Sequence, residues 1–409
     1  MKATNLKLLA VAAIGLGLAL APHGARAQVS GNVVRIGVLN DQSGLYADTG
    51  GQGSVRAAKM AVGDFGGKVL GQPIEVIFAD DQNQPDVGAA IARRWIDAEG
   101  VDTIVDVTPS SVALAVQAIT KEKNRVLLMS SPASSDLTGK YCSPVGIHWT
   151  YDTYALAHGT GGALVKQGGD TWFFITADYA FGHALERDTS EAVIAAGGKV
   201  LGSVNAPFPS SDFSSFLLQA QASKAKVIGL ANAGGDTINA IKQAAEFGIV
   251  AGGQRLAGLL VFITDVHSLG LQTAQGLVIT TPYYWDMNDE TRAFAKRFMS
   301  FPESKGVPPT FLQAGVYTEV MHYLRAIQAA GTDEATAVVA KMREIPINDF
   351  MVKNGSIRID GRVMRDMYLA QVKSPGESKY PFDYYKILAT IPREQAFRPL
   401  KDGGCYLVK

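Results

Sequence analysis

The sequence lacks most of the features by which enzymes and nucleic-acid-binding proteins are recognised. Its 409 residues carry 38 Lys and Arg against 38 Asp and Glu, so no surplus of positive charge is available for nucleic acid. No phosphate-binding Gly-x-x-x-x-Gly-Lys-Ser/Thr loop occurs, nor does a His-Glu-x-x-His or Gly-x-Ser-x-Gly motif. Six scattered His and two Cys do not make a metal site. These absences disfavour an enzyme, and we expect no cofactor and no metal.

Long apolar segments are missing everywhere except at the N-terminus. There, Lys2 and Lys7 precede an apolar run over 8–21, and a small-x-small triplet follows at 25–27. This pattern predicts a signal peptide over residues 1–27 that is cleaved on export. The alternative is a membrane anchor, but the run is shorter than the ~20 residues that a transmembrane helix needs. We therefore expect a soluble periplasmic protein.

Cysteine is scarce, and the two that occur lie in loop-like sequences rich in Gly or Pro. Cys142 lies in "GKYCSP" and Cys405 in "DGGCYLVK". Exported proteins fold in an oxidising compartment, where exposed cysteines tend to pair. We predict a disulfide between them that ties the C-terminal tail to the first half of the chain; the alternative is two free thiols.

Short β-branched runs that alternate with amphipathic segments dominate the rest of the chain. The expected strands lie at 33–40, 74–80, 102–107 and 125–131, and again at 171–177, 199–204, 226–231, 254–260 and 276–281. Alternating strands and helices are typical of parallel α/β sheets, and two such runs predict two doubly wound lobes. About 380 mature residues also exceed one comfortable core.

Helical periodicity predicts a helix at 86–98, with Asp86 as its N-cap, and long helices at about 310–330 and 333–344. A β-like segment at 354–373 predicts a hairpin that turns at Gly361.

Small polar loops follow the predicted strands, at the sheet edge where open α/β folds bind ligands. In the first half these loops lie at 40–54, 107–115 and 130–139, and they contain Ser110 and Ser111. The alternative is that their hydroxyls serve only as helix caps, but three such loops at one edge favour an anion-binding cleft.

The second half offers matching loops at 176–185, 230–237 and 261–270. Tyr179 and Phe181 beside a glycine suggest rings that face the cleft. The segment from Asn232 through Ala233 and Gly234 allows a close approach of backbone.

Five stretches resemble the branched-chain amino acid and amide-binding proteins of ABC transporters, which are type I periplasmic solute-binding proteins. They read "IGVLNDQSGLYADTGGQGSVRAAKMAV", "VTPSSVALAV", "SSPASSDLT", "DYAFGHAL" and "GLVITTPYYWD". The resemblance covers nearly all of the chain after the predicted signal peptide, in order. It implies two Rossmann-like lobes joined by a three-strand hinge, lobe 1 at 29–148 plus 282–345 and lobe 2 at 149–281 plus 346–409. The chain would cross between the lobes at 148–150, at 280–282 and near 345.

The resemblance also implies ligand-binding positions. Hydroxyls and backbone N–H groups at Ser110 or Ser111, Ala133 and Ser135 match those that hold the ligand carboxylate in the family, while Phe181 and Trp285 match rings that pack on the ligand. The first-loop aromatic of the family falls on Thr49, with Tyr46 as a possible substitute. The full expected set is Tyr46, Thr49, Ser110, Ser111, Ala133, Ser134, Ser135, Tyr179, Phe181, Asn232, Ala233, Gly234, Asp265, Tyr284 and Trp285.

One departure from the family pattern bears on the ligand. The acidic residue that pairs with the ammonium of an amino acid falls near 260–262, where this chain is apolar, and Asp265 or Asp236 would have to replace it. A buried ammonium without a counter-charge is very costly. We therefore expect a carboxylate ligand with an apolar or aromatic body, and a branched-chain amino acid stays as the alternative.

The expected function is that of a monomeric periplasmic receptor that binds a small solute and delivers it to ABC permease subunits in the inner membrane. The alternative is a sensory module of the same fold that reports the ligand to a receptor or regulator. No nucleic-acid partner is expected.

Overall fold

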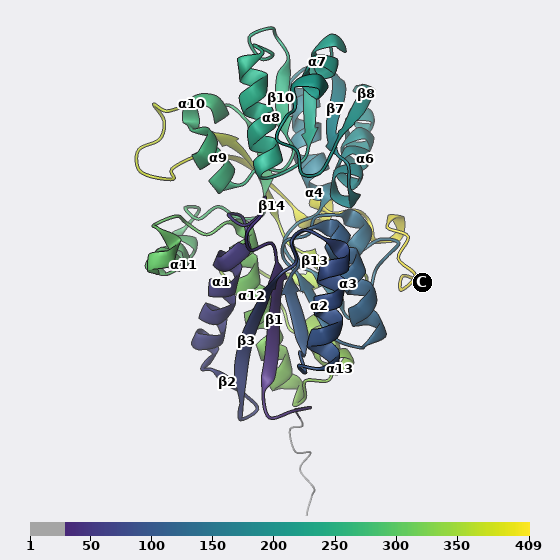
Figure 1. Cartoon of the computed structure of the whole chain (residues 1–409), viewed down its shortest axis with the longest axis vertical. Coiled ribbons are helices and arrows are strands. Elements are labelled where there is room, and N and C mark those ends of the chain that lie inside the picture. The colour runs from purple at the N-terminus through teal and green to yellow at the C-terminus, as the bar shows by residue number, and fades with distance from the viewer. Residues whose placement is uncertain (1–28) are drawn as a thin grey trace, which may run out of the picture.

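The chain folds into two α/β bodies stacked along the long axis of the molecule (Figure 1). The computed structural model describes residues 29–409, and the predicted signal peptide lies outside them. One sheet has six strands in the order β2-β3-β1-β4-β5-β6, and the other has four in the order β10-β9-β7-β8. In the described part of the chain, no helix combines the length and apolar character needed to cross a membrane.

The first body is built on β1 (Val34–Asn40), β2 (Lys68–Val69), β3 (Gln72–Asp80), β4 (Thr103–Asp106), β5 (Val126–Met129) and β6 (Gly146–His148). All neighbours in this sheet pair in parallel except β2 with β3. Helices α1 (Gly51–Phe65) and α12 (Phe311–Ala330) pack together, with α13 (Ala335–Glu344) against α12, and α2 (Pro85–Asp97) and α3 (Ser110–Glu122) form a second pair.

Strand β1 is buried on both faces, as a central parallel strand must be. Val34, Ile36 and Val38 belong to the same core as α1 and α12, while Leu39 packs in the core of α2 and α3. A Cβ on Gly37 would lie 2.5 Å from a ring carbon of Trp95, so only glycine lets α2 approach this strand.

The second body repeats the strand order of the first with β7 (Thr171–Ala177), β8 (Lys199–Ala206), β9 (Val227–Ala231) and β10 (Arg255–Gly258), all parallel. Its helices are α4 (Thr153–Leu156), η2 (Ala157–Gly161), α5 (Gly162–Lys166), α6 (Ala180–Ala195), α7 (Ser214–Ala222), α8 (Gly235–Glu246), α9 (Ile263–Leu269) and α10 (Leu271–Ala274). The prediction of two doubly wound α/β lobes is confirmed. The lobe boundaries stay a prediction.

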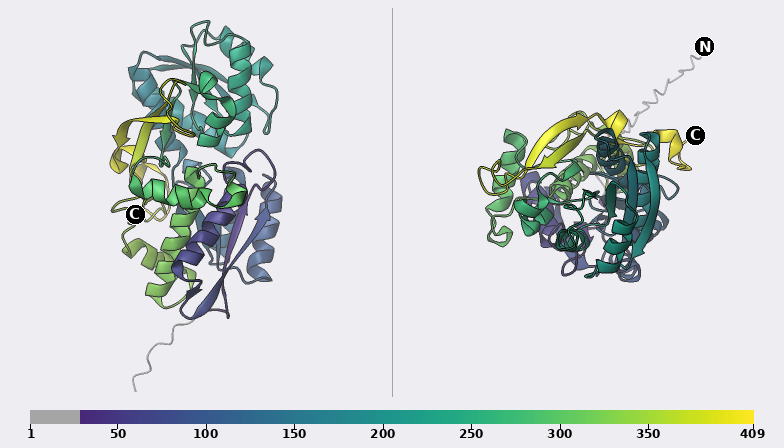
Figure 2. Two further views of the ribbon diagram at one scale, coloured as in Figure 1. Left: turned by 90° about the vertical axis from the view of Figure 1, so that its left-hand side faces the viewer. Right: turned by 90° about the horizontal axis from the view of Figure 1, so that it is seen from above.

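The C-terminal segment forms a third, antiparallel sheet of β11 (Val278–Thr281), β14 (Met367–Val372) and β15 (Tyr385–Ile391). Figure 2 shows these last strands along one flank, at the level where the two bodies meet. The expectation that 276–281 joins the parallel sheet of the second lobe was therefore wrong. The returning strand β14 supplies its hydrogen bonds instead.

Shorter elements complete the chain: η1 (Ser135–Leu137), α11 (Asp289–Met299), η3 (Pro302–Ser304), β12 (Ser356–Ile357), β13 (Val363–Met364), α14 (Arg393–Ala396) and η4 (Leu400–Asp402). The predicted hairpin exists between β12 and β13, and Gly361 turns it with a φ of +89°.

Two further expectations concern local chemistry. The disulfide between Cys142 and Cys405 is confirmed, with Cα atoms 5.6 Å apart. Asp86 as the N-cap of α2 was wrong: the helix begins at Pro85, and Gln84 is the N-cap. Proline suits the first helical position because its missing N–H would have no partner there.

Candidate functional site

Loops at the carboxyl ends of parallel strands from both sheets converge on one cavity between the two bodies. From the first body come the loops after β1, β4 and β5, and from the second those after β7, β9 and β10. The lining residues are Tyr46, Thr108, Ser110, Ser131, Ala133, Tyr151, Tyr179, Phe181, Ala233, Leu260, Phe262 and Leu312. This is the edge at which open α/β sheets bind ligands.

The cavity is small because lining residues of the two bodies touch, as Tyr46 and Tyr179 do at 2.6 Å between hydroxyl oxygens. Its volume is about 20 Å³, little more than the ~10–15 Å³ that one water molecule requires. An organic ligand can enter only if lining side chains or the two bodies move apart.

Six of the fifteen predicted ligand residues lie in this cavity. They are Tyr46, Ser110, Ala133, Tyr179, Phe181 and Ala233. Their contact with a ligand stays a prediction, and the other nine lie outside the lining.

On the side of the first body, two lining residues, Thr108 and Ser110, carry hydroxyl protons without an acceptor among residues 29–409. Ser110 Oγ accepts hydrogen bonds from the backbone N–H of Ala133 (3.2 Å) and of Ser134 (3.1 Å), which leaves its own proton free. Thr108 Oγ1 is buried and has no hydrogen-bond partner among residues 29–409. Such buried hydroxyls need an acceptor, and a ligand oxygen could provide it.

A buried carboxylate, Asp106, lies behind this side of the cavity and is hydrogen-bonded to the lining residue Ser131. Asp106 accepts hydrogen bonds from Asn40 (2.7 Å), from Ser130 (3.0 Å) and from Ser131. Burial raises the pKa of Asp106. Because the Ser131 hydroxyl already donates to Asp106, it is not a free donor for a ligand.

The phenols of Tyr46 and Tyr179 meet across the two bodies at the cavity, with 2.6 Å between their hydroxyl oxygens. Tyr46 follows β1, and Asp41 holds its backbone N–H at 2.8 Å. Phe208 stacks on both rings, at centroid distances of 5.8 Å from Tyr46 and 4.1 Å from Tyr179. Burial raises the pKa of both phenols, so they are neutral hydrogen-bonding groups.

The rest of the wall is apolar apart from the Tyr151 hydroxyl, which donates to the Ser131 carbonyl at 2.8 Å, and no charged side chain belongs to the lining. Leu260 and Phe262 occupy the position where the sequence suggested that an acid is missing. Asp265 instead accepts the Phe262 N–H at 2.9 Å, and Asp236 accepts the Ser210 N–H at 3.0 Å. Burial raises the pKa of Asp265 to about 7 and that of Asp236 to about 6. Neither carboxylate lines the cavity.

Trp285 and Tyr284 lie beside a second, smaller cavity of about 10 Å³. The Trp285 indole and the Tyr284 hydroxyl both donate to the Phe382 carbonyl, at 3.0 and 2.9 Å. Phe311 lines this second cavity and stacks on Phe262 of the first at 4.9 Å. Trp285 and Tyr284 therefore hold the C-terminal loop that contains Phe382 in place.

The remaining predicted residues serve local structure. Thr49 donates to the Tyr46 carbonyl, Ser111 lies in the first turn of α3, and Ser134 caps η1. Asn232 accepts from Thr237 (2.7 Å), and Gly234 lies against the Tyr46 ring.

Ser135 takes part in a polar contact between the two bodies. Its hydroxyl donates to Asp188 of α6 at 2.7 Å, and its backbone N–H donates to Thr153 at 3.0 Å. The Thr153 hydroxyl also donates to Asp188, at 2.6 Å.

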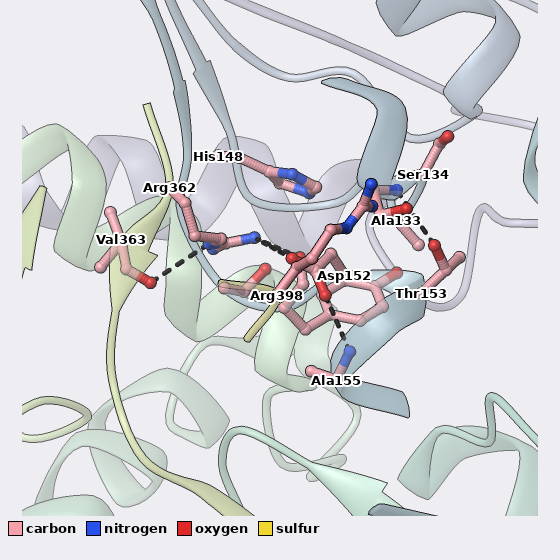
Figure 3. Close-up of polar contacts among 12 residues, drawn as sticks. Ala133, Ser134, His148, Asp152, Thr153, Ala155, Arg362, Val363 and Arg398 are labelled. Carbon is pink, nitrogen blue, oxygen red and sulfur yellow. Dashed lines mark hydrogen bonds and ion pairs between the residues drawn. The ribbon is translucent and has the colours of Figure 1, made fainter. Parts of the chain in front are cut away.

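The segment that follows β6 is held by a buried arginine from the C-terminal part of the chain (Figure 3). Arg362 donates to the Tyr151 carbonyl at 2.7 Å and lies 3.6 Å from the Asp152 carboxylate, and burial lowers its pKa to about 10. Asp152 caps α4 through the Ala155 N–H (2.8 Å), and the Thr153 N–H donates to the Ala133 carbonyl (2.7 Å). These contacts fix the backbone of Tyr151 and Ala133, which both line the cavity.

Sequence reasoning did not select six lining residues: Thr108, Ser131, Tyr151, Leu260, Phe262 and Leu312. Thr108 and Ser131 stand in the polar loops that the sequence singled out, and the apolar character of 260–262 was noted. Tyr151 directly follows the expected crossover. Leu312 carries no local signal, because α12 reaches the cavity from a distant part of the chain.

The described residues contain no group of three or more His, Cys, Asp and Glu side chains that could hold a metal ion. The lining of the cavity offers hydroxyl groups and rings, which can bind a small molecule through hydrogen bonds and apolar contacts.

Comparison with known proteins places the chain among solute receptors. A family model described as periplasmic binding protein matches residues 33–378. A periplasmic binding protein from Burkholderia mallei is 52% identical, with 92% of this chain and 100% of that chain covered and a TM-score of 0.90. A branched chain amino acid ABC transporter periplasmic ligand-binding protein from Burkholderia xenovorans LB400 is 41% identical, with the same coverages and a TM-score of 0.81.

A curated relative, the Leu/Ile/Val-binding protein homolog 6 of Brucella melitensis, is 25% identical, with 89% of this chain and 93% of that protein covered. The fold alone is shared with an R. palustris ABC transporter solute-binding protein in complex with benzoate, at 21% identity and a TM-score of 0.77, with 88% of this chain and 96% of that chain covered.

Proposed function

The chain belongs to the periplasmic binding protein family, among the relatives of the Leu/Ile/Val-binding proteins, and on this premise we propose that it captures a small carboxylate between its two bodies. The carboxylate would belong to a molecule with an apolar or aromatic body, and the chain would deliver it to the permease of an ABC importer. Binding and closure are the whole mechanism: a ligand that touches both bodies favours the closed state.

One observation carries the choice of ligand: the cavity offers hydroxyl protons without acceptors and has no charged side chain. Thr108 and Ser110 can donate to an acceptor-only group, which is what an ionised carboxylate is. No lining carboxylate is present to pair with the ammonium of an amino acid, and Asp265 and Asp236 are engaged elsewhere. A carboxylate without an ammonium therefore fits better than leucine or valine.

The size and shape of the lining favour a compact body. Phe181, Phe262, Leu260 and Leu312 supply apolar surface on which a ring or short branched chain would be desolvated. A distant protein with the same fold binds benzoate, so the fold can accommodate an aromatic carboxylate.

A panel of ligands tests this proposal by thermal denaturation and titration calorimetry. Aromatic carboxylates such as benzoates and short branched carboxylates should stabilise the protein, whereas leucine and valine should not. A ligand at a hundredfold its dissociation constant adds about 2.7 kcal/mol to the free energy of unfolding, which a melting curve detects. Tight binding of leucine or valine without binding of any simple carboxylate would contradict the proposal.

Delivery to a permease needs a separate experiment. The ligand-bound protein, added to membranes that contain candidate permease subunits, should crosslink to those subunits and stimulate their ATP hydrolysis. Crosslinking to a sensor protein instead, with no effect on any permease, would favour a sensory role of the same binding event.

A further inference from the structure

A hydrogen bond between Tyr46 and Tyr179 joins the two bodies at the wall of the cavity. Tyr46 belongs to the loop after β1 and Tyr179 to the loop after β7, so their hydroxyls come from different sheets. Neither hydroxyl has another hydrogen-bond partner within residues 29–409. Each phenol therefore depends on the other to satisfy its hydroxyl away from water.

A ligand must disturb this pair. The cavity of about 20 Å³ is too small for any molecule with a ring or a short branched chain. Making room separates the two bodies at the lining, and Tyr46 and Tyr179 stand on opposite sides of that separation. The Tyr46 ring also lies against Gly234 and Phe208 of the second body.

Separation without replacement is unfavourable because both hydroxyls would stay buried and unpaired. A ligand hydroxyl can repair the loss, since it accepts a hydrogen bond from one phenol and donates to the other. A ligand that has no hydroxyl at this end can neither accept a hydrogen bond from one phenol nor donate one to the other. Sites whose buried polar groups expect a partner discriminate strongly against ligands that lack one.

We propose that Tyr46 and Tyr179 together select for a hydroxyl group on the ligand, at the end remote from its carboxylate. The preferred ligand class is then a hydroxylated aromatic carboxylate. This inference rests on the proposed function, because it takes the carboxylate to lie at Thr108 and Ser110.

Titration calorimetry of the purified protein with benzoate, 3-hydroxybenzoate and 4-hydroxybenzoate tests the inference. The wild type should bind the better of the two hydroxybenzoates at least about tenfold more tightly than benzoate. In Tyr179→Phe that preference should fall below about threefold, because benzoate no longer breaks a hydrogen bond when it binds and a ligand hydroxyl no longer finds two partners. Tyr46→Phe should have the same effect, which guards against misfolding of either variant.

Tyr317→Phe is the matched control, because Tyr317 also donates through its phenol, to Asp64 at 2.7 Å, and does not line the cavity. It should keep the wild-type preference. Equal binding of all three acids by the wild type, a preference that survives in both variants, or loss of every ligand by folded Tyr179→Phe would each overturn the inference and leave the proposed function standing. A wild type that binds none of these acids but binds leucine would overturn both.

Discussion

Thr108 lies two residues beyond the end of β4, and its buried hydroxyl has no hydrogen-bond partner in the described part of the chain. A polar group in this state costs stability unless something outside the chain satisfies it. If Thr108 binds the ligand as proposed, its hydroxyl lowers stability and strengthens binding, so its removal should have opposite effects on the two.

Thr108→Val tests this demand directly, since valine keeps the shape and removes the hydroxyl. We expect the free energy of unfolding to stay the same or rise, while affinity for a carboxylate ligand falls about tenfold or more, the loss of one charge-assisted hydrogen bond. Urea denaturation and calorimetry measure the two effects.

The matched control is Thr103→Val. Thr103 is also buried, but its hydroxyl donates to the Val126 carbonyl at 3.0 Å within the sheet. This substitution should lower stability by about 1 kcal/mol and leave affinity unchanged. The same response from both variants would contradict the role given to Thr108.

The sequence predicted the loops that reach the cleft, but it could not identify which residues of those loops line it. The loop after β4 was recognised as polar, but whether Thr108, Ser110 or Ser111 faces the cleft depends on where α3 begins, and it begins at Ser110. Trp285 illustrates a second limit. Nothing near it in the sequence indicates that a loop almost a hundred residues later places the Phe382 carbonyl within 3.0 Å of its indole.

At the scale of elements, the start of α8 forms a slot for the loop after β1. Gly234 precedes this helix with a φ of +57°, and a Cβ there would lie 3.1 Å from the Leu45 carbonyl and from the Tyr46 ring. Glycine is required at this position for two reasons: the backbone conformation there, and the close approach of the opposite body.

Gly234→Ala should therefore hinder closure. We expect ligand affinity to fall at least about tenfold, with a larger radius of gyration in small-angle scattering in the presence of ligand. Gly248→Ala is the matched control, because Gly248 has a φ of +63° and open space around it. The two variants share the backbone cost of a left-handed alanine, about 1 kcal/mol or more. Equal ligand affinity in both would refute a role of Gly234 in closure.

Elements were predictable wherever a local pattern determines them. The expected strand at 171–177 coincides with β7, and the expected helix at 310–330 differs from α12 by one residue. The partner of β11 could not be found in this way, because its antiparallel neighbour β14 lies about ninety residues later and the strand reads as buried with either partner.

At the scale of the whole molecule, stability depends on buried acids that ionise when the chain unfolds. Burial raises the pKa of Asp265 to about 7, against an ordinary value of 3.8. Between about pH 4 and 7 the folded state therefore binds more protons at this residue than the unfolded state does. The contribution of Asp265 to the free energy of unfolding accordingly falls as pH rises through this window.

Asp265→Asn isolates this contribution, since the amide oxygen can still accept the Phe262 N–H. Relative to the wild type, the variant should gain stability between pH 5 and pH 8, as measured by urea denaturation at each pH. Asp289→Asn, at a fully exposed side chain on α11, should show little such gain. A stability difference for Asp265→Asn that is independent of pH would count against the buried, protonated carboxyl.

The disulfide from Cys142 to Cys405 gives the molecule an unusual covalent topology. Its two sulfurs are separated by 263 positions, so the chain between them is a macrocycle that contains β6, the entire second sheet and the antiparallel C-terminal strands. All the expected crossovers, at 148–150, at 280–282 and near 345, lie within this ring. A single peptide-bond cleavage anywhere in the second body would thus open the ring without releasing a fragment.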